Sequence, residues 1–252
     1  MPVIPEGKKK KRERMRRAVG IIANPVSARD IRRVIANATA LQITDRANIV
    51  LRVLSCLHAC GVETVVMMPE NGGIRHHVRR GIDRSENQGE RHFPTLDHLD
   101  YKISGTVADT VRAAKDMAEM GVEAIVVLGG DGTHRAVVSA CGDVPVAGIS
   151  TGTNNAFPEH REPTITGLAV GLAVSGRVPA KTAYLPNKKL VVRLNGKEEI
   201  ALVDVAVVTD RFIGARALWR TGTLRELFVA FADPEAIGMS ASAGLLKPVS
   251  RL

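Results

Sequence analysis

The chain has 252 residues, of which 45% are hydrophobic and only 3% aromatic, and its formal net charge is +9. This composition supplies enough apolar material for a folded core, while the scarcity of aromatic side chains argues against a nucleic-acid surface built on stacked rings. Residues 1–17 hold eight Lys or Arg against two Glu, so six of the nine net positive charges lie there. Such a run predicts a disordered basic tail, and nucleic-acid binding through it ranks below a simple solvated leader.

The cysteines and the apolar stretches exclude two further classes of protein. No apolar stretch reaches the roughly 18 residues of a membrane span, and the basic start lacks the apolar region of a secretory signal. Cys56, Cys60 and Cys141 form neither an even disulfide set nor a Cys-x-x-Cys pair, and the first two lie four apart in an apolar helical run. We therefore expect core cysteines in a cytoplasmic protein that does not act in a membrane.

Apolar runs and helical periodicities alternate along residues 18–180. In chain order they predict a strand over 18–23, a helix over 44–60, a strand over 62–69, a brief helix over 71–82, a surface loop over 83–98, a third strand over 101–104, a helix over 106–121 capped by Thr106, a strand over 123–130, a helix over 133–141, a strand over 143–151, and a helix from Ile165 packed closely through Gly167 and Gly171. This alternation predicts an α/β domain with a parallel sheet flanked by helices.

The pattern changes near residue 181. Asn195-Gly196 separates two extended runs, which is the strongest short signal for a β-hairpin. Pro179 and Pro186 mark the junction. We expect a β-rich second domain over 181–252 behind the α/β domain over 18–180.

Three polar turns follow predicted strands: NPVSARD, which begins at Asn24, then GGDGTH and finally STGTNN. In open parallel sheets, ligands bind at the carboxyl ends of the strands, so turns from separate strands can converge on one crevice. This convergence is the main functional signal in the sequence.

The turn GGDGT places an acid among three glycines. Gly129, Gly130 and Gly132 remove every Cβ that would keep a ligand from the main chain, and they permit positive φ. Their N–H groups favour phosphate oxygens, with the hydroxyl of Thr133 nearby. Because Asp131 would repel phosphate, it is expected to hold Mg²⁺ or to take a proton from an attacking hydroxyl, both of which belong to phosphoryl transfer. The alternative is a simple tight turn.

The second polar turn comprises Gly152, Thr153, Asn154 and Asn155. Asn side chains often bond their own backbone in turns, but after a buried strand of the same sheet these residues are expected to bind nucleotide phosphate or ribose. His134 either touches phosphate or is an exposed first-turn histidine. No histidines show the spacing of metal ligands, and we predict no metal site built by the protein alone.

The segments NPVSA, GGDGT and GTNN, in this order and ahead of a β-rich domain, resemble the superfamily that joins NAD kinases to diacylglycerol and sphingosine kinases. The sequence from GIIANPVSARDIRR to ALVDVAVV is most similar to ATP-NAD kinase-like proteins of the acetoin-catabolism protein X type. The resemblance implies an ATP- and Mg²⁺-dependent kinase, with its active site between a Rossmann-like domain and a β-sandwich.

The resemblance also implies residue roles. Asp131 would deprotonate the ribose 2′-hydroxyl of NAD, and the glycines with Thr133 would cradle phosphate. Asn154 and Asn155 match the second motif of the lipid-kinase branch better than that of NAD kinases. By the same analogy we expect a homo-oligomer.

Two departures from the family pattern keep alternatives open. The Asn-acid pair with which NAD kinases read the nucleoside is replaced by Val203-Asp204, so the acid remains available for a sugar hydroxyl or solvent, but the amide is lost. The region 181–252 is also shorter than the usual sandwich, which suggests a truncated domain. A lipid or polyol kinase, and a non-catalytic nucleotide-binding accessory protein of acetoin catabolism, are the alternatives to an NAD kinase.

Overall fold

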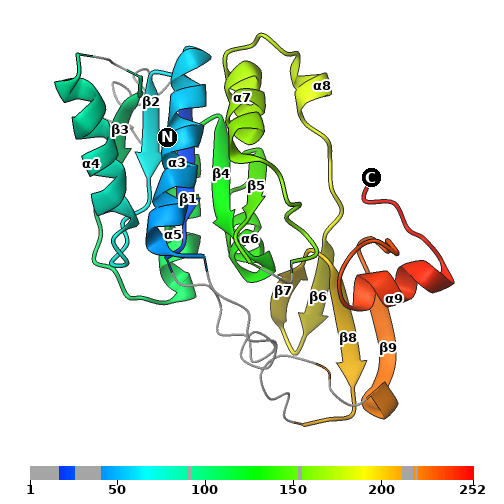
Figure 1. Ribbon diagram of the computed structural model, residues 1–252. Helices are drawn as coiled ribbons and strands as arrows, with labels where there is room; N and C mark the ends of the chain where they lie inside the picture. The colour runs from blue at the N-terminus through cyan, green and yellow to red at the C-terminus, as the bar shows by residue number, and fades with distance from the viewer. Residues whose placement is uncertain (1–16, 26–40, 90–91, 153–154, 212–217, 219–220) are drawn as a thin grey trace, which may run out of the picture.

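A computed structural model of the chain describes residues 17–25, 41–89, 92–152, 155–211, 218 and 221–252. Residues 1–16 of the predicted basic tail, together with Thr153 and Asn154, lie outside the described residues. The centre is a five-stranded parallel sheet in the order β3-β2-β1-β4-β5 (Figure 1). Two antiparallel sheets of two strands each, β6-β7 and β8-β9, come after it in the chain. The α/β class with C-terminal antiparallel strands is as predicted.

The sheet is built from five short strands, most of them aliphatic. They are β1 (Ala18–Ala23), β2 (Thr64–Met67), β3 (Thr95–His98), β4 (Ala124–Gly129) and β5 (Val146–Ser150). β1 and β4 are buried at every position, as expected of central strands covered on both faces.

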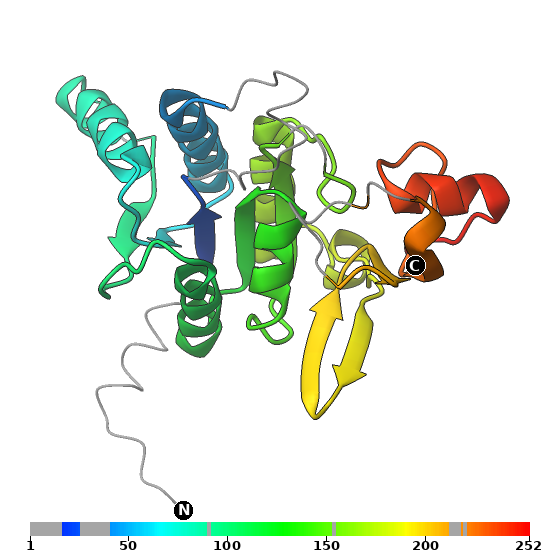
Figure 2. The same cartoon turned by 90° about the horizontal axis from the view of Figure 1, so that it is seen from below.

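Helices cover both faces of the sheet (Figure 2). One layer holds α3 (Ile43–Ala59), α4 (Ile74–Asn87) and α7 (Pro163–Val174). The other holds α5 (Val107–Met120), whose Thr106 side chain accepts a hydrogen bond from the Ala108 N–H as predicted, and α6 (Asp131–Val138). The short α8 (Ala180–Ala183) leads toward the C-terminal strands.

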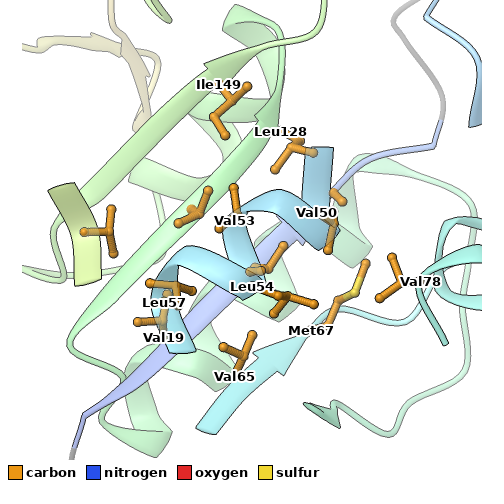
Figure 3. Close-up of a cluster of buried hydrophobic side chains, with 14 of the residues drawn as sticks. Val19, Val50, Val53, Leu54, Leu57, Val65, Met67, Val78, Leu128 and Ile149 are labelled. Atoms are coloured by element: carbon orange, nitrogen blue, oxygen red, sulfur yellow. The ribbon is translucent and has the colours of Figure 1, made fainter. Parts of the chain in front are cut away.

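Successive residues of the central strands divide between two apolar clusters. Val19, Val126 and Leu128 face α3 and α7, and the neighbours of these residues, such as Ile125 and Val127, face α5 and α6. Figure 3 shows α3 lying across the sheet, with Val50 and Leu54 directed at the strands. Each buried aliphatic side chain of this kind contributes about 1.5–3 kcal/mol to folding.

Helices α3 and α7 meet along a seam of glycines and cysteines. The sequence predicted close packing at Gly167 and Gly171 and core cysteines, but not that these two helices meet. A methyl group on Gly171 would lie 2.6 Å from Cys60 Cβ, and one on Gly167 would lie 2.9 Å from Cys56 Cβ. Both thiols are buried and free, and that of Cys60 donates to the Leu168 carbonyl. The absent side chains are therefore what lets the two helices approach.

We expect Gly167→Ala to destabilise the protein by about 1–2 kcal/mol. The new methyl group would lie 3.1 Å from both Cα and O of Val53, which are backbone atoms that cannot turn aside. Overpacking of about 1–3 kcal/mol exceeds the helix-propensity gain of about 1 kcal/mol. The control is Gly81→Ala in α4, where the methyl group meets only the side chain of Leu51. Urea unfolding of both variants measures the difference, and equal stability of the two would contradict the packing argument.

The predictions for residues 83–104 were wrong. The helix predicted over 71–82 continues to Asn87, and the third strand is Thr95–His98, inside the segment predicted to be a loop, whereas residues 101–104 are not a strand. β3 is an edge strand of alternating exposed and half-buried residues, and within the described part of the chain it pairs with β2 alone. Its polar composition hid the strand, because an edge position demands little hydrophobicity.

The C-terminal region contains two pairs of antiparallel strands. Strands β6 (Leu190–Leu194) and β7 (Lys197–Ala201) are joined by Asn195-Gly196, both at positive φ, which confirms the predicted hairpin. This hairpin projects from the body of the molecule in Figure 2. Strands β8 (Asp204–Val208) and β9 (Leu224–Val229) form the other pair, a 3₁₀ turn precedes β9 at Thr221–Thr223, and α9 (Met239–Leu246) follows.

The C-terminal strands lie beyond the end of the parallel sheet to which β4 points (Figure 1). Arg135 of α6 forms an ion pair with Glu199 of β7, with 2.9 Å between Nη1 and Oε2. Among the described residues, no helix is long and apolar enough to cross a membrane.

Candidate functional site

The carboxyl edge of the sheet gathers the polar turns that the sequence singled out. β1 and β4 are adjacent central strands, and after them the chain goes to opposite faces, to α3 and α6 respectively. In open parallel sheets, ligands usually bind where neighbouring strands lead to opposite faces in this way. Asn24 follows β1, Gly130 follows β4 and Thr151 follows β5.

Arg46 of α3 ties two of these strand ends together. Its side chain is 1% exposed, and Nη1 donates to the Asn24 carbonyl over 2.7 Å and to the Thr151 hydroxyl over 3.3 Å, while Nε donates to the Leu41 carbonyl. Sequence reasoning missed this residue. The available signal was a charge on the apolar face of a helix, since Arg46 is spaced four and seven residues from Val50 and Val53.

The segment GGDGT is a strand end and a helix start. Gly129 ends β4, Gly130 is the N-cap, and α6 begins at Asp131, two residues earlier than predicted. Gly130 has φ −97°, and neither it nor Gly129 nor Gly132 uses positive φ. The conformational freedom expected of these glycines is therefore not what the fold uses.

Space explains two of the glycines instead. A methyl group on Gly129 would lie 2.5 Å from Thr133 Cβ, and one on Gly130 would lie 2.6 Å from Asn155 Oδ1. Gly132 is exposed with open space around it. The N–H groups of the first turn of α6, at Asp131 and Gly132, have no partner within the helix and can bind an anion at this edge.

The Asp131 carboxylate is half-buried and held by the loop after β5. Its two oxygens accept hydrogen bonds from the N–H groups of Ala156 over 3.0 Å and Phe157 over 2.9 Å. Both oxygens retain lone pairs that these bonds do not use. The carboxylate is thus fixed at the N-terminus of α6, and it joins the GGDGT segment to the loop.

Asn155 fills the space between the two glycine-containing turns. Its Nδ2 donates to the Ser150 hydroxyl over 2.9 Å, and a methyl group on Gly152 would lie 2.7 Å from the same nitrogen. The predicted pairing of the two motifs at one edge is therefore seen for Gly130, Gly152 and Asn155.

His134 is not at the surface, which contradicts both interpretations offered by the sequence. The ring is fully buried, and its Nδ1 lies 2.9 Å from the Gly130 carbonyl. Burial lowers the pKa of this imidazole, so the neutral ring donates from Nδ1 and supports the N-cap. The burial was not predictable locally because it depends on Gly148: a methyl group there would lie 2.6 Å from Nε2.

Asp204 begins β8 and is half-buried, not fully exposed to solvent. Burial, with a smaller contribution from the negative charge of Asp131, raises the pKa of the Asp204 carboxyl. The two acids, one from each part of the chain, thus share an electrostatic environment.

Among the residues that the structure describes, no group of three or more His, Cys, Asp or Glu side chains is placed to hold a metal ion.

Both parts of the chain match known protein families. Residues 19–175 match the ATP-NAD kinase N-terminal domain, and residues 188–252 match the acetoin catabolism protein X C-terminal domain. The chain is 58% identical over 238 residues to the acetoin catabolism protein X of Cupriavidus necator, an alignment that covers 92% of this chain and 66% of that protein. The chain thus spans just under two thirds of the length of this relative. It belongs to the ATP-NAD kinase family and carries a C-terminal domain of the acetoin catabolism protein X type.

Proposed function

We propose that the protein transfers a phosphoryl group from ATP to a hydroxyl acceptor, with the 2′-hydroxyl of NAD as the favoured acceptor. The observation that carries the proposal is the fixed carboxylate of Asp131, which lies at the N-terminus of α6, where free N–H groups favour phosphate. An anion site beside an oriented carboxylate is what phosphoryl transfer to an alcohol requires.

In the proposed reaction the acceptor oxygen bonds to the γ-phosphorus while the bond from that phosphorus to the β–γ bridging oxygen breaks, and ADP leaves. The hydroxyl proton goes to Asp131. The amide N–H groups of Gly130, Gly132 and Gly152 would donate hydrogen bonds to the phosphate oxygens of ATP, and Mg²⁺ bound to those phosphates would neutralise their charge. Asn24, Thr133 and Asn155 contact the nucleotide, and Asp204 accepts a hydrogen bond from a sugar hydroxyl. Thr153 and Asn154 belong to the same turn by sequence.

A different acceptor is the second candidate. Val203 stands where NAD kinases carry an amide, and a valine side chain makes no hydrogen bond to a nucleoside. Losing a side chain that hydrogen-bonds to the nucleoside weakens binding by about 1–3 kcal/mol. This substitution supports a lipid or polyol acceptor, or nucleotide binding without turnover as an accessory to acetoin catabolism.

An acceptor screen separates these functions. ADP release would be measured with Mg²⁺ and ATP in the presence of NAD, of diacylglycerol in mixed micelles, and of neither, and the phosphorylated products would be identified by mass spectrometry. NADP formation supports the favoured acceptor. Calorimetric binding of ATP or NAD with no product supports the accessory role. Inorganic polyphosphate in place of ATP tests the donor, and light scattering tests the expected homo-oligomer.

We expect Asp204→Asn to raise Tm by a few degrees near neutral pH. Because the pKa of Asp204 is raised above its ordinary 3.8, the folded state binds the proton more tightly than the unfolded chain. The ionised carboxylate therefore lowers stability as pH rises from 3.8 through the raised pKa, and the amide removes this penalty. Thermal unfolding from about pH 4 to about pH 8 should show the difference shrinking toward acid. The exposed Asp143→Asn is the control, and a pH-independent difference would contradict the prediction.

A further inference from the structure

The C-terminal segment of the described chain reaches the loop that holds Asp131. An antiparallel bridge between Ala232 and Val249, with both hydrogen bonds at 2.9 Å, fixes this segment. Lys188 adds a bond from its ammonium to the Ser250 carbonyl over 2.8 Å. These contacts direct the side chain of Arg251 toward the edge of the parallel sheet.

The Arg251 guanidinium contacts two consecutive carbonyls of the loop. Nη2 donates to the Ala156 carbonyl over 2.8 Å and Nη1 to the Phe157 carbonyl over 3.1 Å. The opposite side of the group is covered by the ring of Phe231, with 3.8 Å between the guanidinium carbon and the ring centroid. Among the described residues, Arg251 forms no ion pair, so its charge acts on peptide carbonyls.

One peptide group connects this arginine to Asp131. The Ala156 carbonyl accepts from Arg251, and the Phe157 N–H of the same peptide unit donates to Asp131 Oδ1 over 2.9 Å. A cation on the oxygen polarises the peptide group and strengthens its N–H as a donor to an anion. The Arg251 guanidinium and the Asp131 carboxylate are thus linked through one peptide group that lies between them.

We propose that Arg251 is a positioning residue for the phosphoryl transfer: it fixes the Asp131 carboxylate through the Ala156–Phe157 peptide and so couples the C-terminal domain to the GGDGT segment. The catalytic part of this inference rests on the proposed function. Arginine suits the task because its planar fork reaches both carbonyls at once and stacks on the Phe231 ring. A lysine reaches one carbonyl and does not stack in this way.

The kinetic test measures phosphorylation of the acceptor that the screen identifies. It compares kcat and KM of Arg251→Ala and Arg251→Lys with those of the parent protein. Loss of a residue that positions the carboxylate should lower kcat by about tenfold or more and change KM for ATP by less than about twofold. Lysine should restore part of the rate, and millimolar guanidinium ion should restore part of it in Arg251→Ala. Parental kcat in Arg251→Ala, or an equal loss in both variants without rescue by guanidinium, would overturn the proposal.

Hydrogen exchange tests the bridge without relying on activity. The amide protons of Ala156 and Phe157 should exchange about tenfold faster in Arg251→Ala, and to an intermediate degree in Arg251→Lys. The control is Arg193→Ala, which removes an exposed arginine paired with Glu198 on the β6-β7 hairpin and should leave these amides unchanged. Unchanged exchange in Arg251→Ala overturns the bridge. If Arg251→Ala does not fold, Arg251→Lys decides in its place. If the parent turns over no acceptor, the proposed function fails, while exchange still decides the bridge.

Discussion

Asp131→Asn is expected to lower kcat for phosphoryl transfer by about 10²–10⁴-fold, because an amide does not accept the hydroxyl proton. The substitution also has a structural effect, since one of the N–H groups of Ala156 and Phe157 then faces an NH₂ instead of a carboxylate oxygen. An unsatisfied partly buried donor of this kind costs about 1–3 kcal/mol. Steady-state kinetics and thermal unfolding of the same sample measure the two effects separately.

Two comparisons make the result for Asp131→Asn decisive. Asp143→Asn changes an exposed acid and should keep the parental rate. ATP binding by calorimetry should persist in Asp131→Asn near its parental affinity, because the N–H groups of the first turn of α6 are unchanged. Parental turnover by Asp131→Asn would remove the assigned role of this carboxylate.

Arg46→Leu is expected to destabilise the fold by about 2–4 kcal/mol and to weaken nucleotide binding about tenfold or more. The leucine leaves the carbonyls of Asn24 and Leu41 and the hydroxyl of Thr151 without the donors that Arg46 supplies. The turns after β1 and β5 then lose the side chain that holds them together. Urea unfolding and ATP titration measure the two consequences.

Arg52→Leu is the matched control on the same helix. The Arg52 side chain is 51% exposed, hydrogen-bonded to Thr164 and paired with Glu162 at the surface. Exposed pairs contribute about 0–1 kcal/mol, so the substitution should change stability by no more than this and leave ATP binding unaltered. Equal losses in Arg46→Leu and Arg52→Leu would show that the buried contacts of Arg46 do not hold the site.

Much of the α/β domain could be predicted from the sequence because its elements are encoded locally. β1 and β4 are apolar runs buried at every position, Thr106 caps α5, and Asn195-Gly196 closes a hairpin. The convergence of GGDGT with the turn after β5 followed from the rule that parallel strands end at one edge. These features require only residue type and spacing.

The contacts that fix the site could not be predicted in this way. Asp131 meets Ala156 and Phe157, which lie 25 and 26 residues away, and Arg251 meets the same loop from 94 and 95 residues away. Such bonds depend on backbone groups, which every residue possesses, so no pattern of side chains marks them. The burial of His134, in α6, likewise depends on the absence of a side chain at Gly148, which lies in β5.

The seam between α3 and α7 has a chemical consequence for work with this protein. Burial raises the pKa of the Cys56 thiol, and the Gly167 and Gly171 surface of α7 covers both Cys56 and Cys60. We therefore expect an alkylating reagent to react with these sulfurs mainly when α7 separates from α3. Cys141, which lies in the apolar cluster on the opposite face of the sheet, serves as an internal reference for complete unfolding. The ratio of the labelling rates reports how often one layer opens while the other stays closed.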